Sequence, residues 1–152
     1  LPMSRLKAVC LDAGLEHVET YIAGGNVVFE SKAAPAKIKA TLEAALRQEL
    51  GKPVGVMLRS AAELRAILEA NPFRNTEPKY AHVIFLDTAP PADALDHVRG
   101  RHDEELRLAE REIYVHYPSG MGRSKLRIPA ASEGTARNIN TVTKLVELTS
   151  KP

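Results

Sequence analysis

The chain has 152 residues, of which 44% are hydrophobic and 26% are charged, and its net charge is +2. This ordinary globular composition excludes a disordered or fibrous chain, and so small a net charge gives no support by itself for nucleic-acid binding. No apolar run approaches the ~18 residues that a membrane-spanning helix needs, so we expect no membrane association.

Cys10 is the only cysteine, so neither an internal disulfide nor a zinc site built on paired cysteines is expected. It shares a helical stripe with Leu6 and Val9, which predicts a buried, unreactive thiol. A single thiol is typical of a reducing compartment, so we expect a cytoplasmic protein. The five histidines lack metal-ligand spacing, and we therefore expect no metal site and no cofactor.

The first part of the chain alternates helical and strand patterns. The predicted elements are a helix at 3–13, strands at 17–22 and 26–30, a helix at 36–50 and a strand at 54–58. Gly14 and Gly51 end the two helices, since glycine readily adopts the left-handed conformation of a helix terminus. Gly24 and Gly25 form a two-residue hairpin signal, because both can take a positive φ.

The second part contains more strands. The predicted elements are a helix after Ser60, a strand at 81–86, a helix at 90–98, strands at 106–109 and 113–117, a short helix at 123–127, a strand at 135–137 and a final helix. Ser60 and Glu63 have the spacing of a capping box. Asn140 or Thr141 is the expected cap of the final helix.

Both parts follow the element order of the split β-α-β, ferredoxin-like unit, provided that a strand precedes the first helix. We therefore predict an α+β fold of two ferredoxin-like halves, residues 1–59 and 60–152, with the first half lacking its opening strand. Because that strand would lie inside the sheet, its absence would leave backbone groups unpaired. We expect the natural chain to begin roughly 20 residues before Leu1.

Four segments together resemble an uncharacterised bacterial family, domain of unknown function 1697. They are residues 15–22, 25–29, 122–126 and 135–142. The chain departs from the family pattern at its opening, where a glycine-rich Arg-Gly-Ile-Asn turn is absent. It also has Gly24 in place of serine, Ile139 in place of tryptophan, and a short segment between Lys125 and Thr135. The resemblance implies a cytoplasmic bacterial protein of two ferredoxin-like halves, and it implies no reaction.

A glycine-rich basic loop is the first candidate site. It comprises Gly122, Arg123, Ser124 and Lys125, which follow a predicted strand and open a predicted helix. Free N–H groups at a helix start attract anions, and the two cations would add to this attraction. The loop lacks the spacing of a P-loop or a dinucleotide-binding motif. The alternative is a flexible loop with solvated cations.

Three further residues are candidates for ligand binding. Arg137 presents a planar fork suited to phosphate or carboxylate, or forms a structural ion pair. Asn138 beside it is either a ligand contact or a helix cap. Asn26 follows the glycine pair and is either a ligand contact or a turn residue. We expect Arg137 and the loop after Gly122 to converge on one anion site.

These patterns favour a small binding or regulatory module for a phosphate- or carboxylate-bearing ligand. Residues 119–152 contain six basic and two acidic residues, so the basic part of the chain coincides with the candidate site. One alternative is an enzyme acting on a phosphorylated or carboxylated metabolite, which would need an acid or base such as Glu133 or His116 beside Arg137. Another is a protein-partner or RNA-binding module, with Tyr114 and His116 on one strand face, although the aromatic content of 5% disfavours RNA. The oligomeric state has no sequence signal.

Overall fold

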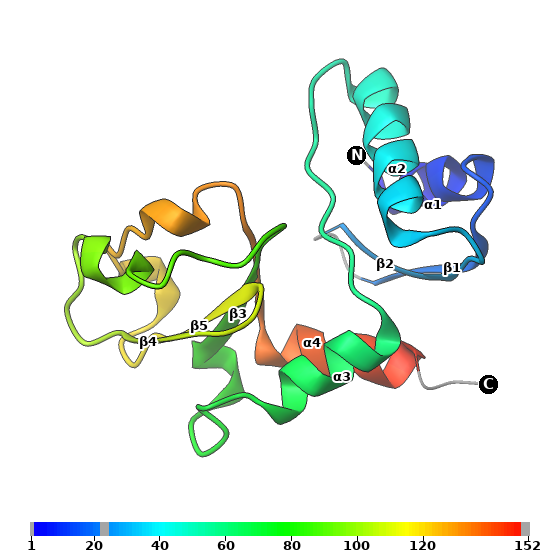
Figure 1. The fold of residues 1–152 in the computed structure, drawn as a ribbon. Helices are drawn as coiled ribbons and strands as arrows, with labels where there is room; N and C mark the ends of the chain where they lie inside the picture. The colour runs from blue at the N-terminus through cyan, green and yellow to red at the C-terminus, as the bar shows by residue number, and fades with distance from the viewer. Residues whose placement is uncertain (1, 22–24, 150–152) are drawn as a thin grey trace. The chain divides into compact units, whose positions relative to one another are not determined.

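The computed structural model describes residues 2–21 and 25–149. The chain divides into two compact units (Figure 1). One contains the residues up to Leu58 and the last described residues from Leu148 onward, and the other is Arg59–Glu147. The fold is mixed α+β, as predicted, with four α-helices and two antiparallel sheets in the described ranges. None of these helices has the length and apolarity that crossing a bilayer requires.

The first unit packs two helices with a β-hairpin. Its elements are α1 (Met3–Asp12), β1 (Glu16–Tyr21), β2 (Asn26–Glu30) and α2 (Pro35–Leu50). Its core consists of Leu6, Val9, Cys10, Leu15, Val18, Ile38, Leu42 and Leu46. Both helices lie within one residue of their predicted ranges. Gly14 and Gly51 follow them with φ of +90° and +72°, the left-handed backbone expected of helix terminators.

Cys10 is buried, as its place on the apolar stripe predicted. Its exposed fraction is 2%, and burial raises the pKa of its thiol. A raised pKa lowers the thiolate fraction at neutral pH, and the thiolate is the nucleophile. The unreactive thiol expected from the sequence therefore stays a prediction with a physical basis.

The hairpin pairs β1 with β2 in antiparallel fashion, with Tyr21 opposite Asn26. An irregularity between Glu16 and Glu19 coincides with a positive φ of 51° at His17. Gly25 has a φ of +80°, as the turn requires, whereas Ile22 and Gly24 lie outside the described residues. Asn26 is buried, and its side-chain amide donates to the Tyr21 carbonyl at 3.3 Å.

The predicted strand at 54–58 is wrong, because this segment pairs with none of the described strands. Its apolar residues Val54, Val56 and Leu58 pack against the core of the first unit instead. The Val56 N–H donates to the Glu43 carboxylate at 3.2 Å rather than to a neighbouring strand. Alternating apolar residues indicate a half-buried extended segment, but such a segment need not pair with a neighbouring strand. The expected strand before Leu1 stays a prediction.

The second unit is built on a four-stranded antiparallel sheet. Its elements are α3 (Ala61–Glu69), β3 (Ala81–Phe85), β4 (Glu105–Leu108), β5 (Glu112–His116), β6 (Thr135–Asn138) and α4 (Ile139–Thr149). The strand order is β4-β5-β3-β6, which puts β3 and β5 in the centre. The capping box of α3 is confirmed, because Ser60 and Glu63 exchange hydrogen bonds of 2.8 and 3.1 Å.

Two predicted helices are replaced by single 3-10 turns. Only Ala94–His97 is helical in the range 90–98, and only Met121–Arg123 is helical near 123–127. In the range 90–98, Leu95 and Val98 pack against the core of the second unit, and near 123–127 Arg127 exchanges backbone hydrogen bonds of 2.9 and 2.7 Å with Arg99. An extended backbone that bonds to a distant segment cannot also form helical hydrogen bonds.

Both faces of the four-stranded sheet are covered by protein. On one face, Ile84, Leu106, Ile113 and Val115 pack with side chains from the connecting segments, among them Leu126. On the other face, the buried Tyr114 hydroxyl donates to the Ile67 carbonyl of α3 at 2.6 Å. Tyr114 therefore offers no solvent-facing surface on which a base could stack.

A buried ion pair fixes the start of the second unit to its sheet. The Arg59 and Glu112 side chains are 5% and 7% exposed and meet at 2.9 Å. Arg59 also donates to the carbonyls of Leu86 and Arg111, at 2.8 and 2.9 Å. The carboxylate and two carbonyls thus satisfy a guanidinium that would otherwise be costly to bury.

Candidate functional site

The predicted basic loop follows β5 and is held in place by its backbone. Gly120 has a φ of +87°, which favours glycine, and leads into the 3-10 turn Met121–Arg123. Ser124 is extended, so the predicted helix does not continue beyond Arg123. A single 3-10 turn lacks the array of free N–H groups that begins an α-helix. The anion attraction expected from a helix start is therefore wrong, and the side-chain cations remain.

A second segment, just before β4, lies against this loop. Gly100 has a φ of +69°, and a Cβ atom there would come within 2.1 Å of the Lys125 carbonyl oxygen. Only glycine permits this approach, because any other residue would overlap the backbone. The bridge between Arg99 and Arg127 continues the contact along the chain.

Glu104 connects the two segments through its buried carboxylate. It accepts a hydrogen bond from the Ser124 hydroxyl and another from the His102 N–H, at 2.6 Å for the latter. The Ser124 oxygen in turn accepts from the Leu126 N–H at 3.1 Å. These bonds, chiefly that from Ser124, hold the pKa of Glu104 below its ordinary value. Ser124 thus has a structural partner, and the carboxylate fixes the loop.

The two segments enclose a pocket of about 210 Å³. It is lined by Gly100, His102, Asp103, Glu104, Ser119, Gly120, Arg123, Ser124 and Lys125. Its carboxylates are engaged with hydroxyl groups, since Asp103 accepts from Ser119 at 2.5 Å and Glu104 accepts from Ser124. Arg123 and Lys125 are exposed, and neither forms an ion pair with a carboxylate of the described residues. The groups available to a ligand are therefore mainly cationic.

Three of the four predicted loop residues line this pocket, namely Arg123, Ser124 and Lys125. Gly122 lies on the same turn but does not line it. Gly100, Asp103 and Glu104 were not predicted from the sequence, because they join this pocket only in the folded chain. One signal was available: Leu126 and Ile128 alternate with Lys125 and Arg127, a period of two that indicates an extended segment.

Arg137 and Asn138 lie elsewhere on the sheet and do not line the pocket. Arg137 is on β6, opposite Val83, and is half-buried, which lowers the pKa of its guanidinium. It donates to the Ala136 carbonyl at 2.8 Å. Since β3 separates β6 from β5, the two strands are about 9–10 Å apart. The structure thus does not bring Arg137 to the loop pocket.

Asn138 caps the last helix, and its carboxamide oxygen accepts from the Thr141 N–H at 2.9 Å. The cap is therefore the residue just before α4, and the prediction of Asn140 or Thr141 as the cap is wrong. Asn26 belongs to the first unit, where it bonds to the hairpin. His116, one candidate acid or base, contacts Glu105 at 3.3 Å and the Phe73 ring.

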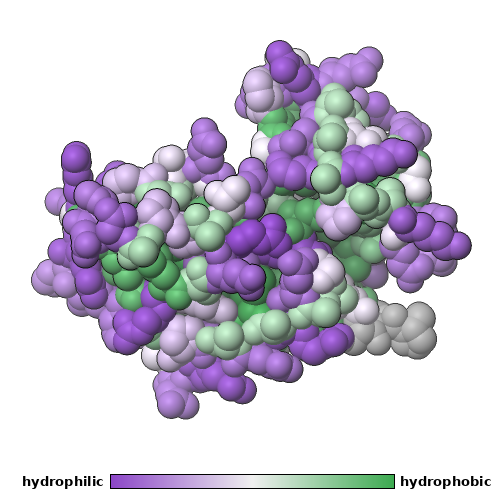
Figure 2. Space-filling model, viewed as in Figure 1, coloured by the Kyte–Doolittle hydropathy of each residue, from purple (hydrophilic) through white to green (hydrophobic). Residues whose placement is uncertain are grey.

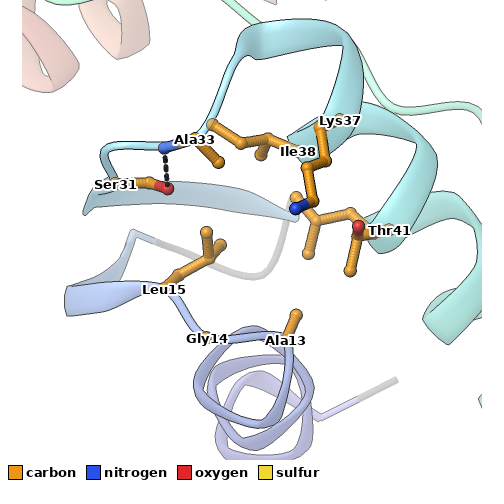
Figure 3. Close-up of a pocket in the computed structure, with 9 residues that line it drawn as sticks. Ala13, Gly14, Leu15, Ser31, Ala33, Lys37, Ile38 and Thr41 are labelled. Carbon is orange, nitrogen blue, oxygen red and sulfur yellow. Dashed lines mark hydrogen bonds between the residues drawn. The ribbon is translucent and has the colours of Figure 1, made fainter.

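A second pocket, of about 180 Å³, lies in the first unit (Figure 3). Leu15, Ile38 and Leu42 give it an apolar wall, and the Lys37 ammonium group turns toward it. Ser31 is occupied locally, since its hydroxyl accepts from the Ala33 N–H at 3.1 Å. One lysine on an exposed helical turn is a weaker anion contact than the two cations of the loop pocket.

Other kinds of site find little support in the described ranges. No group of three or more histidine, cysteine, aspartate or glutamate side chains there could hold a metal ion. Figure 2 shows a mostly hydrophilic face, with apolar residues in separate patches. The large hydrophobic residues exposed among the described ones are Leu11, Leu50 and Met121. A partner-binding surface usually presents a larger contiguous apolar patch.

Comparisons with known proteins address the family and the fold. A solved structure, the conserved bacterial protein SP0830 from Streptococcus pneumoniae, is similar with a TM-score of 0.81 and 23% sequence identity, over 99% of this chain and 90% of that one. This likeness supports the fold and carries no activity. No curated protein matches the chain. The sequence matches the family described as "Protein of unknown function (DUF1697)" over residues 1–114, well over half of the chain. The chain therefore belongs to this family, as its sequence resemblance indicated.

Proposed function

We propose that the loop pocket of the second unit binds the anionic group of a small ligand that bears a phosphate or carboxylate. The observation that carries this proposal is a pair of exposed cations, Arg123 and Lys125, at the wall of a pocket whose backbone is fixed by Glu104 and Gly100. A fixed loop loses little conformational entropy on binding, so more of the contact energy contributes to affinity.

The carboxylates in the wall restrict the ligand. Asp103 and Glu104 would repel an anionic group placed beside them, so that group must lie on the side of Arg123 and Lys125. A hydroxyl or amino group on the same ligand would suit the carboxylate side, since ionised carboxylates only accept hydrogen bonds. The proposal is thus a phosphorylated or carboxylated metabolite with hydrogen-bond donors.

Three further expectations remain proposals beside this binding or regulatory role. They are a cytoplasmic location, a bacterial source and a ferredoxin-like origin for both halves. An enzymatic role would need an acid or base beside the bound anion. Glu133 and His116, the candidates predicted beside Arg137, do not line this pocket, whereas His102 and two carboxylates do.

The test is a calorimetric titration of the protein with phosphate, phosphate monoesters and small carboxylates. A charge-assisted contact contributes about 1.5–3 kcal/mol. The double variant Arg123→Ala/Lys125→Ala should therefore bind at least about tenfold more weakly. The variant Lys52→Ala/Arg65→Ala removes the same charge at exposed positions elsewhere and should bind like the native protein. Absence of binding at millimolar concentration, or equal loss in both variants, contradicts the proposal.

A further inference from the structure

Two arginines lie directly opposite each other beside the pocket. Arg99 and Arg127 form an isolated antiparallel bridge, in which each backbone N–H donates to the other residue's carbonyl, at 2.9 and 2.7 Å. In a hydrogen-bonded antiparallel pair, opposite side chains project from the same face. The two guanidinium groups therefore leave the backbone on one side.

The burial pattern shows which side this is. Val98, Leu126 and Ile128 pack against the core of the second unit. Lys125 and Arg127 alternate with these apolar residues and are exposed, as is Arg99. We call Arg99, Lys125 and Arg127 the basic ribbon. Its three cations project away from the core, toward solvent.

This arrangement is unfavourable without a counter-charge. Like charges directly opposite each other in a strand pair destabilise the pair. No carboxylate of the described residues forms an ion pair with the three ribbon side chains, and Arg127 donates only to the Leu126 carbonyl, at 3.1 Å. Some arginines elsewhere in the chain do have such a counter-charge, since Arg5 bonds to Glu49 and Arg111 bonds to Glu63.

The ribbon is continuous with the pocket, because Lys125 belongs to both. The pocket volume of about 210 Å³ is small compared with the roughly 300–1,000 Å³ of sites for drug-sized ligands. It can hold one group of a ligand, and the remainder must extend along the surface. Lys125 and Arg127 are two residues apart on an extended chain, a span of about 6.6–6.8 Å.

We propose that the ligand is a chain of successive phosphate groups, one held in the pocket by Arg123 and Lys125 and the next bound across Arg99 and Arg127. This inference rests on the proposed function and names its ligand class. Phosphate is favoured over carboxylate because each guanidinium group can bond two of its oxygens, and because a terminal phosphate carries up to two charges. Such a chain occurs in free polyphosphates and nucleoside triphosphates, and in single-stranded nucleic acid.

The experiment compares three ligands with the full chain. Orthophosphate reports on the pocket, tripolyphosphate on the pocket and ribbon together, and a single-stranded 12-mer on the nucleic-acid source. In the variant Arg99→Ala/Arg127→Ala, tripolyphosphate should bind at least about tenfold more weakly, while orthophosphate binding changes less than about twofold. The matched control Arg47→Ala/Arg65→Ala loses two exposed arginines from helices and should behave as the native protein. Circular dichroism verifies that each variant is folded.

The outcomes separate the two proposals. If orthophosphate binds but tripolyphosphate binds no more tightly, or if the ribbon variant retains tripolyphosphate binding, the ribbon inference is overturned and the proposed function stands. If the native protein binds neither ligand, the ribbon inference is overturned, and the proposed function falls with it when small carboxylates also fail to bind. Equal binding of polyglutamate overturns the choice of phosphate. Tighter binding of the 12-mer, with a log K against log salt slope of about −0.7 per neutralised phosphate, identifies nucleic acid as the source. Tighter binding of tripolyphosphate identifies a free polyphosphate.

Discussion

His82 lies on the central strand β3 with its Nδ1 atom buried and without a hydrogen-bond partner. Its ring meets the Tyr117 ring edge-on, with the ring centres 5.2 Å apart. A neutral imidazole tolerates this apolar contact better than an imidazolium, because a buried charge loses its hydration. Burial accordingly lowers the pKa of His82 from its ordinary value of 6.5, against a smaller opposing effect of the Tyr80 backbone.

This lowered pKa makes the folded protein sensitive to mild acid. Well above pH 6.5 His82 is neutral in both states, so its full contribution to stability is present. As the pH falls below that value the unfolded chain takes up a proton that the folded chain does not, and the free energy of unfolding decreases. The variant His82→Phe should show a smaller decrease between pH 7 and pH 5 in urea unfolding.

The control is the same comparison between pH 9 and pH 8, where His82 is neutral in both states. There the variant should show the same pH dependence as the native protein. The interval above pH 5 avoids the carboxylates whose pKa values are lowered, among them Glu63 and Glu104, since these titrate below their ordinary value of 4.5. An unaltered slope in His82→Phe would show that other groups cause the acid sensitivity.

At the scale of elements, the sequence correctly predicted those whose stabilising contacts lie within their own segment. The apolar stripes of α1 and α2 and the capping box of α3 are recorded within one segment each, so periodicity and caps were sufficient. The errors at 54–58, 90–98 and 123–127 share one cause. In each, a contact distant in sequence determines the backbone: the core of the first unit for 54–58, the core of the second unit for 90–98, and the pairing of Arg127 with Arg99 for 123–127.

The candidate site was likewise predicted only where its residues lie within one segment of the sequence. Its loop was predicted because glycines and cations cluster within six residues, from Gly120 to Lys125. The opposing wall was not, because Gly100 and Glu104 reach Lys125 and Ser124 only through the fold. Arg137 was included on residue type alone, and the strand order places it two strands away from β5.

The contact between the two segments of the pocket depends on Gly100. The variant Gly100→Ala must adopt the left-handed backbone, at a cost of about 1–3 kcal/mol, and must also move its Cβ away from the Lys125 carbonyl. We expect a melting temperature lower by several degrees, since about 1 kcal/mol shifts a domain of this size by about 2–4 °C. Anion binding should weaken with it.

Gly122→Ala is the matched control, because its backbone is not left-handed and nothing lies within 4 Å of the added Cβ. This variant should melt within about 2 °C of the native protein, since surface substitutions away from special features change stability by about 0.5 kcal/mol or less. Equal melting temperatures for the two alanine variants would contradict the role assigned to Gly100.

At the scale of the whole molecule, the two units differ in how completely their strands are paired. In the second unit, β3 and β5 each have a described neighbour on both sides. In the first unit, β1 and β2 pair only with each other among the described strands, and residues 54–58 add no third strand. A two-stranded hairpin alone has marginal stability, so the first unit depends on the packing of α1 and α2.

Hydrogen exchange measures this difference directly. We expect the amides of Val83, Ile84 and Ile113 to exchange slowly, at a rate set by global unfolding, because they lie in doubly paired and buried strands. The amides of Val27 and Val28 should exchange much faster, since the hairpin can open locally without disrupting the second sheet. The measurement is amide exchange at neutral pH, resolved by residue, in the protein without ligand. Equal protection in β2 and β3 would show that the hairpin is as firmly held as the four-stranded sheet, and that the units unfold as one.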